Sequence, residues 1–93
     1  MHELSIAVAL VETACEKAAE IGGPRIEAVH VEIGRLSGVV ADALLFSFDV
    51  AAQGTPIEGA KLRVTETPGR ELLLVALEVE DEEHEIEADA ANR

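Results

Sequence analysis

The stretch RIEAVHVEIGRLSGVVADALLFSFDVAA, residues 25–52, contains two different hydrophobic periodicities, one after the other. In residues 25–33 apolar side chains alternate with polar ones, which predicts a strand with one buried face. In residues 39–52 apolar side chains recur every three or four positions, which predicts a helix. We expect the buried face of this helix to consist of Ala41, Leu44, Leu45, Phe48 and Ala52. A helix that links two strands forms a right-handed crossover, so the strands before and after it should be parallel.

The flanking sequence adds a helix and two strands. Residues 4–21 have helical periodicity and end at Gly22-Gly23-Pro24. Residues 61–65 and 71–80 read as strands, and the turn sequence Thr67-Pro68-Gly69-Arg70 makes the last strand antiparallel to its predecessor. The expected fold is α/β (α+β), a mixed three-stranded sheet with two helices on one face and element order α-β-α-β-β. The buried face of the first helix should be formed by Ala7, Leu10, Val11, Ala14, Ala18 and Ile21. The last strand is apolar on both faces at first, so we expect it to be the best-buried strand or to have one edge covered by a partner.

Length and charge restrict the class of function. The 93 residues suffice for one domain, which we assign to residues 1–80, followed by an acidic tail of residues 81–93. The formal net charge of -12 argues against nucleic acid and anionic membranes as partners, because binding phosphates requires a basic surface. No apolar run approaches the ~20 residues of a membrane span, and no signal peptide is recognisable, so we expect a cytoplasmic protein. Sequence motifs of enzymes, such as glycine-rich phosphate loops and HExxH, are absent, and we expect no enzymatic activity.

The first three residues, Met1-His2-Glu3, have the chemistry of a chelating site. The α-amine, a backbone amide and the ring of His2 lie close enough in the chain to bind one ion. Deprotonated backbone nitrogens would complete a square-planar set, which suits Ni(II) or Cu(II). Glu3 can add either its carboxylate or its own amide nitrogen. We therefore interpret Met1, His2 and Glu3 as a candidate site for Ni(II) or Cu(II), with a solvated terminal histidine as the alternative.

Several motifs occur in one order along the chain. They are MHELSIA at residues 1–7, IGRLSGV at 33–39, LFSF at 45–48, GT at 54–55 and EGAKL at 58–62, followed by the last strand from Gly69-Arg70-Glu71-Leu72 onward. Together they closely resemble the HypA/HybF family, the nickel chaperone of NiFe hydrogenase maturation. The resemblance covers about residues 1–80.

The resemblance implies transient binding and delivery of Ni(II) through the amine of Met1, the ring and backbone of His2, and Glu3. It also implies two partners, a GTPase that co-delivers nickel and the hydrogenase large subunit. Proteins of this family usually carry a zinc module with two CxxC pairs between the last two strands. Here Thr67-Pro68 leads directly to Gly69-Arg70, and Cys15 is the single cysteine, so we expect no structural zinc. Natural loss and engineered removal of the module are both compatible with this join.

Two further features leave alternatives open. His84 lies among carboxylates in Asp81-Glu82-Glu83-His84-Glu85 and is a candidate secondary metal ligand. The alternative interpretation is an acidic tail that binds no metal. The second helix also has a second apolar face. That face consists of Val39, Ala43, Phe46 and Val50. It either packs against another part of the chain or contacts a partner, which includes a second copy of the chain. The alternative function is accordingly an interaction module that kept the scaffold and lost nickel delivery.

Overall fold

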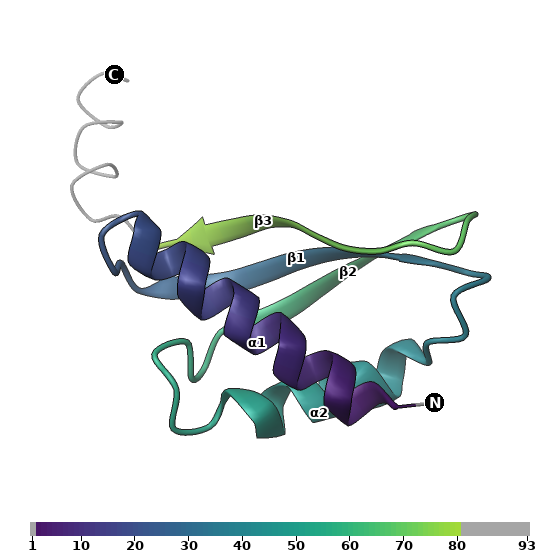
Figure 1. Ribbon diagram of the computed structural model, residues 1–93, viewed down its shortest axis with the longest axis horizontal. Helices are drawn as coiled ribbons and strands as arrows, with labels where there is room; N and C mark the ends of the chain where they lie inside the picture. The colour runs from purple at the N-terminus through teal and green to yellow at the C-terminus, as the bar shows by residue number, and fades with distance from the viewer. Residues whose placement is uncertain (1, 81–93) are drawn as a thin grey trace, which may run out of the picture.

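The first helix, α1 (Glu3–Glu20), follows from its apolar spacing and ends at a glycine pair. Figure 1 shows the computed structural model, which describes residues 2–80. At the end of α1 the N–H of Gly23 donates to the carbonyl of Ala18 at 2.8 Å and that of Gly22 to Ala19 at 3.2 Å. Gly22 has φ 102°, a left-handed conformation that glycine adopts without strain. The chain turns away there, so the prediction that Ile21 belongs to the buried face was wrong, and its side chain is 59% exposed.

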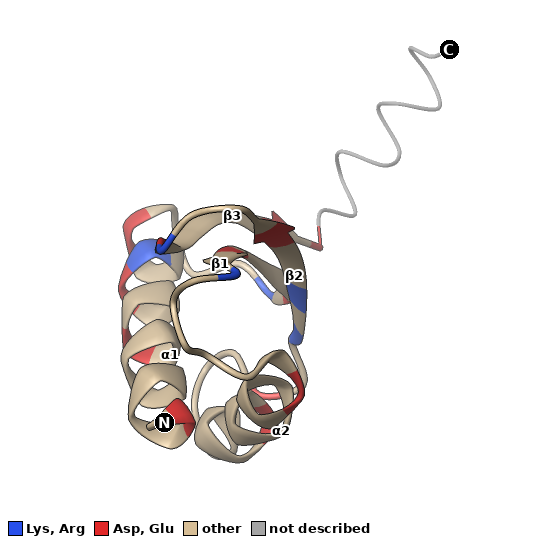
Figure 2. Cartoon of the chain, turned by 90° about the vertical axis from the view of Figure 1, so that its right-hand side faces the viewer, with Lys and Arg blue, Asp and Glu red and all other residues tan. Residues whose placement is uncertain are grey.

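The sheet has the order β2-β1-β3, with β1 (Ile26–Gly34) in the centre. Strand β2 (Lys61–Thr67) pairs with β1 in parallel and β3 (Leu72–Val79) pairs with it antiparallel. Helix α2 (Ala41–Ala52) makes the crossover from β1 to β2. Figures 1 and 2 show α1 and α2 side by side on the same face of the sheet. The predicted α+β architecture and its element order are confirmed.

The core lies between the helices and that face of the sheet. Strand β1 contributes Val29, Val31 and Ile33, as its alternation predicts. Helix α2 contributes Leu44, Phe48 and Ala52, but Ala41 and Leu45 of its predicted buried face are exposed. In residues 2–80 no helix is both long and apolar enough to cross a membrane.

Strand β3 is not the best-buried strand, so the first of the two expectations from its sequence was wrong, and a partner at its edge stays a prediction. The strand lies at an edge of the sheet, and its outward side chains Leu73 and Val75 are 50% and 49% exposed. The helices cover only one face, so an apolar side chain on the other face of an edge strand meets solvent. The best-buried strand is β1, because it has a neighbour on each side.

A four-residue link, residues 68–71, carries the chain from β2 to β3 across the end of β1. The N–H of Leu36 donates to the carbonyl of Gly69 at 2.8 Å, and the N–H of Gly34 donates to the carbonyl of Glu71 at 2.7 Å. A side-chain carbon at Gly34 would collide with the backbone of Gly69. The turn predicted from sequence therefore reverses the chain direction without pairing the two strands that it joins.

Candidate metal centre

His2 is the first residue that the structure describes, and it lies just outside the helix. It occupies the N-cap position of α1 with φ -98° and ψ 61°, and its carbonyl accepts the N–H of Ile6 at 3.1 Å. The residue is exposed. Its ring is therefore accessible to solvent at the start of the helix. Met1, the other predicted nitrogen donor, lies outside the described residues.

The side chain of Glu3 is committed to a structural contact. Glu3 is 8% exposed, and its Oε2 accepts the backbone N–H of Val40 at 2.9 Å. Val40 is the N-cap residue of α2 and has no side chain that could cap that helix. The carboxylate of α1 thus pairs with the positive end of the α2 dipole, where an anion is stabilising. Of the two donors that Glu3 could offer a metal, this geometry favours the backbone amide.

The contact between Glu3 and Val40 should make stability depend on pH. The hydrogen bond from Val40 is the largest influence and holds the pKa of Glu3 below its ordinary value of 4.5, although burial acts in the opposite direction. A carboxylate whose pKa is lower in the folded state stabilises the fold above its ordinary pKa, and this contribution is lost as the pH falls through the folded value.

We therefore expect Glu3→Gln to be less stable than the unsubstituted chain near neutral pH. The difference in unfolding free energy, measured by urea denaturation without metal, should be largest near neutral pH and should shrink as the pH falls below 4.5. A difference that stays constant over this range would contradict the assignment.

The contact between Glu3 and Val40 joins residues 37 positions apart, and sequence reasoning missed it. One signal was present. A helix that begins at Ala41 has valine before it, and valine is a poor N-cap residue. The nearby Ser37 hydroxyl accepts the N–H of Val39 at 3.1 Å, outside the helix. The missing local cap indicates that a group from elsewhere supplies it.

The other candidate ligands do not gather around one point. Within residues 2–80 no group of three or more His, Cys, Asp or Glu side chains could hold a metal ion. His30 lies on the open face of the sheet, where its Nε2 is 3.3 Å from Oε1 of Glu78. The Arg63 Nε approaches the same oxygen at 3.3 Å, and its positive charge disfavours a cation there. His84 lies outside the described residues.

Comparison with known proteins identifies the family. The family model described as "Hydrogenase/urease nickel incorporation, metallochaperone, hypA" matches residues 1–72. The chain belongs to the HypA family. The resemblance seen in its motifs is thereby confirmed.

Two relatives are both named hydrogenase maturation factor HypA. The protein of Roseiflexus sp. (strain RS-1) is 60% identical over 68 residues, which cover 73% of this HypA-family chain and 55% of the relative. That of Geobacter sulfurreducens is 53% identical over 70 residues, which cover 75% of this chain and 61% of the relative. The chain thus matches little more than half the length of these relatives. They are named as maturation factors and not as enzymes.

Two solution structures share the fold of this HypA-family chain. The Ni metallochaperone HypA from Helicobacter pylori superimposes with a TM-score of 0.71 at 21% identity, over 88% of this chain and 100% of that one. A second structure of a HypA protein also gives a TM-score of 0.71, at 20% identity, over 86% and 97% of the two chains. At this level of identity the likeness establishes the fold alone.

The donor set of a HypA zinc module does not fit the described part of this chain. Such a module needs thiolates in CxxC pairs, and the sequence has only Cys15, which is half-buried on α1. Only the four residues 68–71 separate β2 from β3, where the sequence predicted the module to be missing. Residues 2–80 therefore contain no CxxC pair, and the absence of structural zinc stays a prediction.

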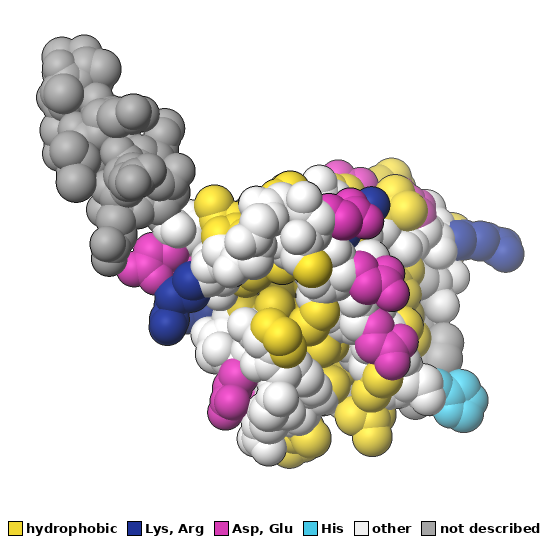
Figure 3. All heavy atoms as spheres, turned by 60° about the vertical axis from the view of Figure 1, so that its left-hand side comes forward, with side chains coloured by type: hydrophobic (Ala, Val, Ile, Leu, Met, Phe, Trp, Pro, Cys, Tyr) yellow, Lys and Arg dark blue, Asp and Glu magenta, His cyan; other side chains and the backbone are white. Residues whose placement is uncertain are grey.

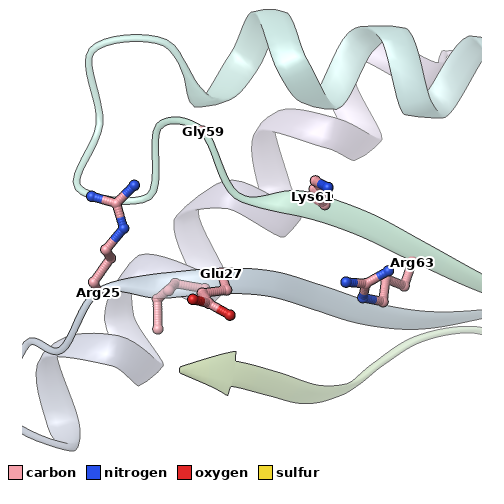
Figure 4. Close-up of a pocket in the computed structure, with 6 residues that line it drawn as sticks. Arg25, Glu27, Gly59, Lys61 and Arg63 are labelled. Carbon is pink, nitrogen blue, oxygen red and sulfur yellow. The ribbon is translucent and has the colours of Figure 1, made fainter. Parts of the chain in front are cut away.

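A pocket of about 300 Å³ at the start of β1 and β2 is cationic (Figure 4). Three cations line it, Arg25, Lys61 and Arg63, together with Ile26, Gly59 and one carboxylate, that of Glu27. Two of these cations have partners, since Arg25 Nε lies 3.1 Å from Glu80 and Arg63 Nε 3.3 Å from Glu78. Figure 2 likewise shows most Lys and Arg on the sheet side of this HypA-family chain. A metal cation would be repelled by this lining, so the pocket is not a rival to the N-terminus.

The second apolar face of α2 is exposed where the structure describes it. Phe46 is 72% exposed and Val50 42%, and Ala43 is exposed beside them. Val39 differs, because it is half-buried and packs against the core. Figure 3 shows hydrophobic side chains on the molecular surface interspersed with carboxylates. In residues 2–80, nothing from the same chain buries Phe46.

Proposed function

We propose that this chain is a metallochaperone that binds one Ni(II) ion at its N-terminus and delivers it during NiFe hydrogenase maturation in the cytoplasm. The ligands are the α-amine of Met1, the ring and backbone of His2, and the backbone amide of Glu3. The observation that carries the proposal is membership of the HypA family, whose model matches from residue 1 and so includes these three residues. The exposed position of His2 at the N-cap supports it, because an incoming ion or partner can reach the ring.

The committed carboxylate of Glu3 agrees with a square-planar nitrogen site. Ni(II) accepts four nitrogen ligands in this geometry, and it does not require a carboxylate. Consecutive backbone nitrogens and one imidazole form such a set without a preformed cage. A site at the start of a chain exchanges ligands readily, which suits an ion that has to be passed on.

The proposed recipients are those of the family resemblance, a nickel-delivering GTPase and the hydrogenase large subunit. Their contact surface on this chain is the exposed part of α2, formed by Ala43, Phe46 and Val50. No structural zinc takes part in the proposed mechanism. The same exposed face supports the alternative, an interaction module that no longer delivers nickel.

Titration calorimetry with Ni(II) tests the proposal on chain with an unblocked Met1. We expect about one ion per chain with a Kd at or below the micromolar range. His2→Ala and an N-terminal variant whose α-amine is blocked by acetylation should each weaken binding at least about 100-fold, because each removes one nitrogen of the chelate. His30→Ala is the matched control, since it removes a histidine that is bound to Glu78 instead.

Two results would contradict nickel delivery. One is the absence of Ni(II) binding, and the other is binding that persists unchanged in both N-terminal variants. Either result would leave the interaction module as the function. The second would also direct attention to His84 in the acidic tail.

A further inference from the structure

Glu3 is the one residue that belongs to both the N-terminal site and the start of α2. Its backbone nitrogen follows His2 directly, while its carboxylate Oε2 accepts the Val40 N–H at 2.9 Å. Among the described residues it is also the single buried charged side chain. Burying an unpaired charge costs free energy. The Val40 amide and the positive end of the α2 dipole offset that cost for the Glu3 carboxylate.

We propose that Glu3 is a positioning residue that couples nickel occupancy at the N-terminus to the first turn of α2. The inference rests on the proposed function for the ion, but its own basis is the contact between Glu3 and Val40. Chelation by the nitrogens of residues 1–3 fixes the backbone at Glu3. When the backbone is fixed, the Glu3 side chain has fewer conformations that break its hydrogen bond with Val40. Binding of Ni(II) therefore strengthens that hydrogen bond.

The start of α2 depends on this bond more than most helix starts do. The four N–H groups at a helix N-terminus have no partner within the helix, and Val40 provides no side-chain acceptor. The first bond inside α2, from Leu44 N to Val40 O, spans 3.0 Å and begins at the same residue. When Glu3 releases Val40, the first turn therefore loses the one side-chain cap that residues 2–80 give it. Ni(II) binding would therefore change the order of the first turn of α2, the helix that carries Phe46.

Coupling of this kind is reciprocal, which makes it measurable in two ways. If Ni(II) lowers the population of the state in which the bond between Glu3 and Val40 is open by some factor, removal of the bond lowers Ni(II) affinity by that same factor. Factors of about 5 to 150 are typical of coupled sites. The exchange rate of the Val40 amide hydrogen reports the bond directly, and Ni(II) titration reports the affinity.

The test compares amide hydrogen exchange at Val40, followed by NMR, with and without one equivalent of Ni(II). In the unsubstituted chain we expect Ni(II) to slow this exchange at least about five-fold. In Glu3→Ala the nickel-dependent slowing should disappear, and Ni(II) affinity should fall by the factor by which exchange was slowed. The visible absorption spectrum of bound Ni(II) should stay that of the unsubstituted chain, because the backbone nitrogens remain. Glu12→Ala removes an exposed carboxylate from the same helix and is the matched control.

Glu3→Gln covers the case in which the alanine variant does not fold. Its side-chain oxygen can still accept from Val40, but a neutral acceptor makes a weaker bond than a carboxylate. The nickel-dependent slowing should be reduced and not abolished.

The negative outcomes separate the two proposals. An altered nickel spectrum in Glu3→Ala would show that the carboxylate is a ligand and would overturn the positioning role. Normal Ni(II) binding with unchanged exchange at Val40 would overturn the coupling and leave delivery intact. No Ni(II) binding at all would overturn both.

Discussion

Phe48→Ala should destabilise the fold by about 3–5 kcal/mol, the range observed when a buried phenylalanine is reduced to alanine. Phe48 is fully buried and is among the largest such side chains in residues 2–80. It lies on the face of α2 that meets the core, so its removal leaves a cavity among aliphatic side chains. Because domains are stable by only about 5–15 kcal/mol, we expect a large fall in the urea midpoint and partial unfolding without denaturant.

The same helix provides a matched control for this substitution. Phe46 lies two residues earlier and is 72% exposed, so Phe46→Ala should change the unfolding free energy by no more than about 0.5 kcal/mol. Both variants lose the same atoms from the same helix. Equal losses of stability would show that the assigned inner and outer faces of α2 are incorrect.

Gly34→Ala should cost about 1–3 kcal/mol, the second largest effect that we expect on stability. The added carbon would meet the carbonyl of Gly69 and the amide of Arg70, and neither backbone group can rotate away as a side chain can. The link between β2 and β3 would have to lift from the end of β1, which lengthens the hydrogen bond from Leu36 to Gly69. Urea denaturation measures the loss.

Gly69→Ala in the same link separates a backbone collision from a general effect of replacing glycine. A carbon at that position meets only the carboxylate of Glu71, which is the flexible end of a side chain. We expect a smaller loss than for Gly34→Ala. A larger loss for Gly69→Ala would mean that the link does not lie against Gly34 as described.

The elements of this fold follow from local patterns, whereas the burial of each element does not. The alternation in residues 25–33 predicts β1 and its inward side chains, because a half-buried strand has a period of two. The sequence of β3 is more apolar than that of β1 on its outer face, and yet β3 is the edge strand. Strand order in the sheet depends on how the crossover and the link are closed, and no local pattern records it.

In the candidate site, too, some features follow from the local sequence and others depend on tertiary packing. The donor atoms of Met1-His2-Glu3 can be recognised from residue types and spacing alone. The fate of the Glu3 carboxylate cannot, because it depends on a contact with Val40 that only the packing of α1 beside α2 creates. Likewise Ile21 continues the apolar spacing of α1, but the helix has already ended at that residue.

The central position of β1 has a consequence for how the chain folds. Its pairings with β2 join residues 33 positions apart, as in Ala28 with Lys61, and those with β3 begin at a separation of 39, as in Ile33 with Leu72. Strands β2 and β3 are joined by a short link but do not pair with each other, so no local hairpin can act as a nucleus for the sheet. Proteins dominated by such distant pairings fold slowly for their size. Because both edge strands pair only with β1, neither β2 nor β3 can join the sheet before β1 is in place.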